Sequence, residues 1–216
     1  MTEFVLGSVL ESVRPRCIAI LAVSVLLGGC AGAARIPEDS FYRLEIAAPA
    51  IRLPAPALTG VLVVQSGTAA PVYRDRALLY SEPETPARLQ RYHYQYWIDT
   101  PPQLVQRSLA DYLRAAGVAT DVVLPEEGID ARYRLRVDIE RFEHRRGRAG
   151  GEVAVGLRLT LAERASGTLL AQEFLQGDAA VQGNDFSAVA AAYRQALTDL
   201  YGRILTRVRA LDSTGR

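Results

Sequence analysis

The sequences Tyr133-Arg-Leu-Arg-Val-Asp-Ile-Glu140 and Glu152-Val-Ala-Val-Gly-Leu-Arg-Leu-Thr-Leu161 both place an apolar residue at every second position. A period of two is typical of a β-strand with one buried face and one solvated face. The loop 144–151 lies between them, so we expect the two strands to pair as antiparallel neighbours. A turn at 165–168 leads to a third expected strand, 169–176, which completes an antiparallel meander.

The apolar residues change to a helical spacing in the last part of the chain. The pattern predicts a long amphipathic helix over about 185–210, capped by Asn184 or Asp185 and packed on the sheet. A second, internal helix is expected over about 101–116. Thr100-Pro101-Pro102-Gln103 combines a capping residue with a proline at the first helical position, and Gly117 is typical of a helix end.

Shorter β-type stretches surround the internal helix. The expected strands are 41–46, 61–64, 77–81, 89–98 and 121–124, with a proline-containing extended loop at 47–59. The predicted fold class is therefore α+β. We expect a mixed, largely antiparallel sheet, with the internal helix and the C-terminal helix packed on it.

Composition restricts the classes of function. Hydrophobic residues make up 49% of the chain and charged residues 23%, which fits one globular domain. The net charge of +1 provides no strong field for nucleic acid, so no nucleic-acid partner is expected. All 25 basic residues are arginine, which excludes a Schiff-base lysine and a P-loop lysine.

The N-terminal region has the features of an export signal. Arg14 and Arg16 precede an apolar run, 17–27, which is shorter than the roughly 20 residues that a membrane-spanning helix needs. That length suits the central region of a secretory signal. The run ends in Leu27-Gly28-Gly29-Cys30, which resembles the lipobox of bacterial lipoprotein signals. The resemblance implies cleavage before Cys30 and a lipid, with palmitate-type acyl chains, on that residue.

The lipobox sets the expected organisation of the chain. The expected parts of the chain are a signal peptide at 1–29, a tether at 30–39, a single domain at 40–211 and a frayed tail at 212–216. The residue after Cys30 is Ala31 and not aspartate, which in double-membrane bacteria implies sorting to the outer membrane. Because Cys17 would leave with the signal, no cysteine remains for a disulfide or a thiolate zinc site. An ordinary signal or short anchor with an incidental cysteine is the alternative.

Three stretches carry a resemblance to a known family. They are P-V-Y-R-D-R-A-L-L-Y-S at 71–81, L-Q-R-Y-H-Y-Q-Y-W-I-D-T-P-P at 89–102 and L-A-D-Y-L-R-A-A-G-V-A at 109–119. Together they resemble the ABC-type transport auxiliary lipoproteins, the PqiC-like accessories of MCE-type phospholipid transport systems. The long extension before Arg14 departs from the pattern.

The family resemblance implies a lipid-anchored protein of the outer membrane that faces the periplasm. Its partner would be an MCE-domain protein of an ABC transport system, and it would hold or cap the end of that assembly. Its contact with the membrane would be the lipid on Cys30. Self-association into a ring is compatible with this role but has no signal of its own in the sequence. The resemblance brings no catalytic residue and no cofactor.

Two groups of residues are candidates for binding. Aromatic residues are enriched at interface centres, so the strand with Tyr92, Tyr94, Tyr96 and Trp97 is a candidate partner-binding surface. Core packing of one of its faces is the alternative. The cluster of Arg141, Arg145, Arg146 and Arg148 at a hairpin tip is a candidate contact for phospholipid headgroups or an acidic partner. A solvated turn is the alternative that we favour.

No motif points to an enzyme. Ser66 and Ser108 lack the glycines of a nucleophile elbow, and no glycine-rich phosphate loop follows a strand. His93 and His144 are far apart in the sequence and do not make up the three or four ligands of a metal site. We therefore expect no catalytic site and no metal site.

Two further functions stay open from the sequence. The first is a periplasmic carrier that binds one acyl chain between helix and sheet, which co-purified lipid would reveal. The second is an assembly factor for another envelope complex, such as lipopolysaccharide or secretin machinery. The Tyr/Trp strand followed by the double proline argues against this second function.

Overall fold

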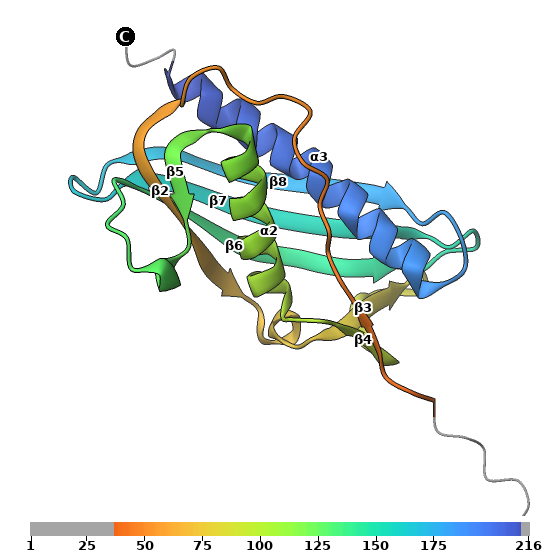
Figure 1. Ribbon diagram of the computed structural model, residues 1–216. Coiled ribbons are helices and arrows are strands. Elements are labelled where there is room, and N and C mark those ends of the chain that lie inside the picture. Colours follow the sequence, from red (N-terminus) through yellow and green to blue (C-terminus); the bar gives the residue numbers. More distant parts are fainter. Residues whose placement is uncertain (1–36, 213–216) are drawn as a thin grey trace, which may run out of the picture. The chain divides into compact units, whose positions relative to one another are not determined.

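Strand β6 (Tyr133–Arg145) lies at the centre of a mixed eight-stranded sheet in the computed structural model, which describes residues 37–212 (Figure 1). It pairs antiparallel with β7 (Glu152–Glu163), and β7 pairs antiparallel with β8 (Leu169–Ala180). The predicted meander is confirmed. Its strands are longer than expected, because the pairing continues towards both hairpin ends.

The other edge of β6 is shared by two strands that follow each other in sequence. Strand β2 pairs parallel with the first half of β6, and β3 pairs parallel with its end after a short 3-10 turn. Strand β5 lies outside β2, β4 lies outside β3, and β1 lies outside β4. The bounds of these strands are β1 Ser40–Tyr42, β2 Leu58–Ala69, β3 Ala77–Glu82, β4 Thr85–Trp97 and β5 Ala119–Val123.

Both predicted helices form, as α2 (Pro101–Ala116) and α3 (Phe186–Asp212), and Figure 1 shows them on the same side of the sheet. The strongly apolar face of β7 is buried beneath α3. Helix α2 ends as predicted at Gly117, whose φ of 66° is left-handed and suits a residue without a Cβ. The Ser108 and Tyr201 hydroxyls lie 2.8 Å apart and link the two helices. The α+β class is thus confirmed.

The segment 43–57 differs from expectation. The strand predicted at 41–46 ends at Tyr42, and the chain then runs beside α2 and passes over the outer side of α3 (Figure 1). Two backbone hydrogen bonds fix the far end of this segment, from Leu53 N to Ala116 O at 2.8 Å and from Leu58 N to Val118 O at 3.0 Å. We call residues 43–57 the strap. Leu44 and Leu53 are buried on the helices, and this burial favours the strap over a longer strand.

The face of the meander opposite the helices carries charged side chains in pairs. Arg136 contacts Asp138 at 2.8 Å, and Arg158 contacts Glu140 at 2.8 Å. The half-exposed Arg158–Glu140 pair contributes little stability, about 0–1 kcal/mol. The buried Asp138, in contrast, also accepts hydrogen bonds from the backbone and hydroxyl of Thr68. In both pairs the guanidinium group of the arginine is already bound to a carboxylate of the same domain.

Several predictions concern residues outside the described range. The signal peptide at 1–29, Cys30, the first part of the tether and residues 213–216 all lie outside residues 37–212. Within that range, no helix has both the length and the apolar character required to cross a bilayer.

Candidate functional site

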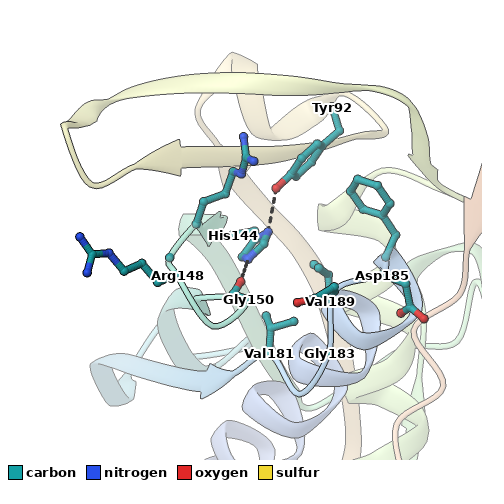
Figure 2. Close-up of a pocket in the computed structure, with 12 residues that line it drawn as sticks. Tyr92, His144, Arg148, Gly150, Val181, Gly183, Asp185 and Val189 are labelled. Atoms are coloured by element: carbon teal, nitrogen blue, oxygen red, sulfur yellow. Dashed lines mark hydrogen bonds between the residues drawn. The ribbon is translucent and has the colours of Figure 1, made fainter.

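A pocket of about 230 Å³ lies at the end of β6, where the β6–β7 hairpin loop meets the loop between β8 and α3 (Figure 2). Strand β4 closes it on a third side through Tyr92. The pocket thus combines one residue of the predicted aromatic group and two of the predicted arginine group with the start of the long helix. Its lining residues are Tyr92, His144, Arg146, Gly147, Arg148, Gly150, Val181, Gly183, Asn184, Asp185, Phe186 and Val189.

His144 is the central side chain of this pocket, and it is only 6% exposed. Its Nε2 lies 2.6 Å from the carbonyl oxygen of Gly150. Because a carbonyl only accepts, Nε2 carries the proton and donates. In the neutral ring Nδ1 is then an acceptor, and the hydroxyl of Tyr92 donates to it at 2.9 Å. Figure 2 shows this chain of two hydrogen bonds, which links β4 to the hairpin loop.

Tyr92 is held on three sides. Its ring lies 4.3 Å from that of Tyr80 and meets Phe186 edge-on at 4.7 Å. Burial raises the pKa of Tyr92 to about 12, so its hydroxyl keeps the proton that it donates to His144. Tyr92 is therefore a structural member of the pocket wall.

Gly150 permits the two loops to approach. Its φ is +90°, and a Cβ at this position would lie 2.7 Å from the carbonyl oxygen of Gly183. The neighbouring Gly151 accepts a backbone hydrogen bond from Val181 at 2.9 Å. Glycine at 150 is thus required by the close packing of the hairpin loop on the β8–α3 loop.

The four arginines predicted as one cluster separate into two pairs. Arg141 and Arg145 are on the open face of the sheet beside acidic residues; Arg145 contacts Glu152 at 2.8 Å. Arg146 and Arg148 are the pair at the pocket. Arg146 contacts Glu82 at 3.2 Å and covers the ring of Tyr80, whereas Arg148 has no ion-pair partner among residues 37–212. In Figure 2 the side chain of Arg148 points away from His144.

The aromatic strand is also divided. Trp97 is 1% exposed and packs edge-on against Tyr193 at 5.0 Å and Phe142 at 5.8 Å. This position corrects the prediction for Trp97, which is a core residue because its large apolar surface is covered by α3 and β6. Tyr94 and Tyr96 are half-buried, and Tyr94 has a φ of 61° where the pairing of β3 with β4 shifts register.

The pocket has the chemistry of a small binding site. The His144–Tyr92 pair has no carboxylate within hydrogen-bond distance of either ring nitrogen, since both nitrogens are already occupied. Asp185 uses its carboxylate to accept from Ala188 N at 2.7 Å and so caps α3. Among residues 37–212, no cluster of three His, Cys, Asp or Glu residues could hold a metal ion. The groups that remain for binding are the guanidinium groups of Arg146 and Arg148 and the apolar side chains that line the pocket.

Acidification should weaken the fold through His144. Burial lowers the pKa of His144, Arg146 lowers it further, and the Gly150 carbonyl opposes the change. The unfolded chain therefore binds a proton that the folded protein lacks, from the ordinary histidine value of about 6.5 down to the depressed folded value. In that window the free energy of unfolding should fall as pH falls, by at most about 1.4 kcal/mol per pH unit.

Urea denaturation of the full chain at several pH values between about 7.5 and about 5 measures this slope. The control is His144→Gln, which keeps a donor and an acceptor but does not titrate. The slope should be smaller in His144→Gln than in the parent protein. Equal slopes in the two proteins would contradict this account of His144.

The fold and the pocket define an α+β domain with a small pocket at one end of its sheet. The chain belongs to the family of ABC-type transport auxiliary lipoprotein components, whose model matches residues 42–204.

Solved structures agree with this fold. Protein XCC0632 from Xanthomonas campestris is 22% identical with a TM-score of 0.69, and the match covers 82% of this chain and all of that one. An uncharacterized protein is 13% identical with a TM-score of 0.60, covering 80% of this chain and 99% of its own. The PelC dodecamer from Paraburkholderia phytofirmans has a TM-score of only 0.40 at 17% identity, covering 71% of this chain and 91% of its own. No curated protein matches the sequence.

Proposed function

We propose that this protein is a non-enzymatic accessory lipoprotein of an MCE-type ABC system for phospholipid transport. The lipid on Cys30 would hold it at the outer membrane, where the domain faces the periplasm and binds the MCE-domain partner. The observation that carries the proposal is the family match over residues 42–204, together with the lipobox at 27–30. The mechanism is tethering: the anchor fixes the domain, and the domain positions the end of the transport assembly.

The structure narrows the residues proposed for this role. Of the aromatic strand, Trp97 lies in the core and Tyr92 is used within the pocket wall. Tyr94 and Tyr96 are half-buried and stay candidates for the partner contact, and Tyr94, at the irregular part of β4, is the one that we would probe first. Of the arginines, Arg148 is the candidate for an anionic headgroup or an acidic partner, with Arg146 beside it.

Photo-crosslinking in the native envelope tests the partner contact. A photoreactive amino acid replaces Tyr94 in the full chain, and mass spectrometry identifies the crosslinked protein. The matched control position is Ile129, which is 48% exposed and precedes β6 at the other end of the sheet. An MCE-domain protein crosslinked from position 94 and not from 129 is expected. Components of another envelope complex at position 94 would favour the assembly-factor alternative.

The carrier alternative finds less support in the packing. An acyl chain between helix and sheet would need room that side chains occupy, since Leu157, Leu159 and Tyr193 are at most 1% exposed there. Mass spectrometry of lipid that co-purifies with the full chain, counted beyond the lipid covalently bound to Cys30, tests this point. One bound phospholipid per protein would favour the carrier over the tether.

A further inference from the structure

Three large side chains form an apolar surface at the edge of the sheet where the described domain begins. Phe41 of β1 is 51% exposed, and Ile98 just after β4 is 45% exposed. Tyr96 lies between them and is partly exposed. We call Phe41, Tyr96 and Ile98 the edge patch. An exposed group of this kind is informative, because large apolar side chains gathered on one surface mark interaction sites.

The strand geometry places the three residues on one face. Phe41 is the register partner of Tyr96, and their rings are stacked with centroids 5.8 Å apart. Ile98 N donates to Tyr42 O at 2.9 Å as one of the hydrogen bonds of the Tyr42–Trp97 pair, so the backbone of Ile98 still follows β1. Since alternate residues of a strand share a face, Ile98 lies on the side of Tyr96. Trp97 points the other way, into the core under α3.

An arginine borders the edge patch. The guanidinium of Arg76 lies 5.5 Å from the centre of the Phe41 ring. Neither Arg76 nor Arg43 has an ion-pair partner within residues 37–212. The acidic residues Glu38 and Asp39 precede Ser40, so the surroundings of the patch are not purely basic. Apolar contact, with arginine at its border, is therefore the chemistry that the patch offers.

The position of the patch in the chain indicates what covers it. Only residues 31–39 separate Cys30 from Ser40, and an extended chain of this length reaches at most roughly 35 Å. The edge patch begins with the second residue of the domain, Phe41. If Cys30 carries a lipid, Ser40 lies within roughly 35 Å of the bilayer surface, and the edge patch follows it directly in the chain. Exposed aromatic and aliphatic side chains beside arginine are what proteins place at the membrane–water interface.

We propose that the edge patch rests on the bilayer that holds the lipid on Cys30, with Phe41, Tyr96 and Ile98 in the headgroup region. This inference rests on the proposed lipid anchor and goes beyond it, because it adds a contact of the folded domain with the membrane. The contact would fix the orientation of the domain: the edge of β1 and β4 faces the lipid. The start of β6 at Tyr133 would then lie away from the bilayer surface, since β6 is a 13-residue strand and its other end is the one that pairs with β3.

The cysteine content of the chain makes a direct test practical. Cys17 and Cys30 are its only cysteines; the first would leave with the signal and acylation would block the second. The full chain carrying Ile98→Cys is produced with its own signal, labelled with an environment-sensitive fluorophore and reconstituted into vesicles of phosphatidylethanolamine and phosphatidylglycerol. A nitroxide-bearing phospholipid serves as the quencher. The matched control is Ile129→Cys, because Ile129 is 48% exposed and precedes the start of β6.

The fluorophore at position 98 should be quenched at least about threefold more strongly than the one at position 129. Adding Phe41→Ser to Ile98→Cys should lower the quenching at 98 without releasing the protein from the vesicles. Equal quenching at 98 and 129 would overturn the proposal. The proposal also fails if position 98 stays in water on vesicles and is shielded only in envelopes that contain a partner protein.

Failure of the anchor gives a different result from failure of the patch. If Cys30 carried no lipid, the parent chain would react with the fluorophore at Cys30 and would not float with vesicles. A protein that floats, does not label at Cys30 and shows no extra quenching at position 98 retains its anchor and lacks the proposed contact. Flotation and labelling of the parent chain therefore precede the quenching measurement.

Discussion

Replacing Trp97 by alanine should lower the free energy of unfolding by about 3–5 kcal/mol, as expected for removal of a fully buried aromatic side chain. Trp97 is 1% exposed and contacts α3 through Tyr193 and β6 through Phe142. Its removal leaves a cavity where β4, β6 and α3 meet. Urea denaturation of the full chain, followed by circular dichroism, measures the change.

The neighbouring residue provides the control for Trp97. Ile98→Ala removes an apolar side chain that is 45% exposed, so it should cost less than about 1 kcal/mol. A small loss of stability in Trp97→Ala, together with loss of partner binding, would restore Trp97 to the predicted partner-binding surface. A large loss of stability places it in the core.

Replacing Cys30 by alanine should abolish lipid attachment and remove the protein from the outer membrane. The thiol is the group at this position that can take a diacylglycerol, and alanine offers no atom for that attachment. The proposed anchor would then be lost, because firm membrane binding needs the acyl chains. Metabolic labelling with an alkyne analogue of palmitate, followed by membrane fractionation, measures both effects.

Cys17→Ala is the matched control for the anchor, since Cys17 lies inside the apolar run of the signal. It should leave both palmitate labelling and outer-membrane location unchanged. A Cys30→Ala protein that still incorporates palmitate, or still fractionates with the outer membrane, would contradict lipidation at Cys30.

The meander and the two helices were predictable because each has a local period. Val153, Val155 and Leu157 repeat at every second residue, and this alternation alone assigns a buried face. Helix α2 was predictable to the residue at both ends, since Pro101 begins it and Gly117 follows its last residue. Local signals of this kind do not depend on what the element packs against.

Other features depend on distant pairing and were missed. The parallel pairing of β2 with β6 joins Leu62 to Tyr133, and no local pattern states a parallel partner. The pocket needs Tyr92 and His144 in contact although 52 positions separate them. From the sequence, His144 was considered only as a metal ligand. Its spacing of two residues from the apolar Phe142, on the same face of β6, was the available signal for its burial.

The way the chain enters the domain determines how a mechanical load from the membrane would be carried. A pull on Ser40 acts first on β1, which has three register pairs to β4, and only then on the strap. Backbone hydrogen bonds hold the chain at Leu53 and Leu58. If residues 40–52 detached from the domain, the chain between the membrane and Leu53 would become longer before the force reached β6 and α3. The edge strand and the strap would thus act as an extensible coupling, which lengthens under load while the core of the domain stays folded.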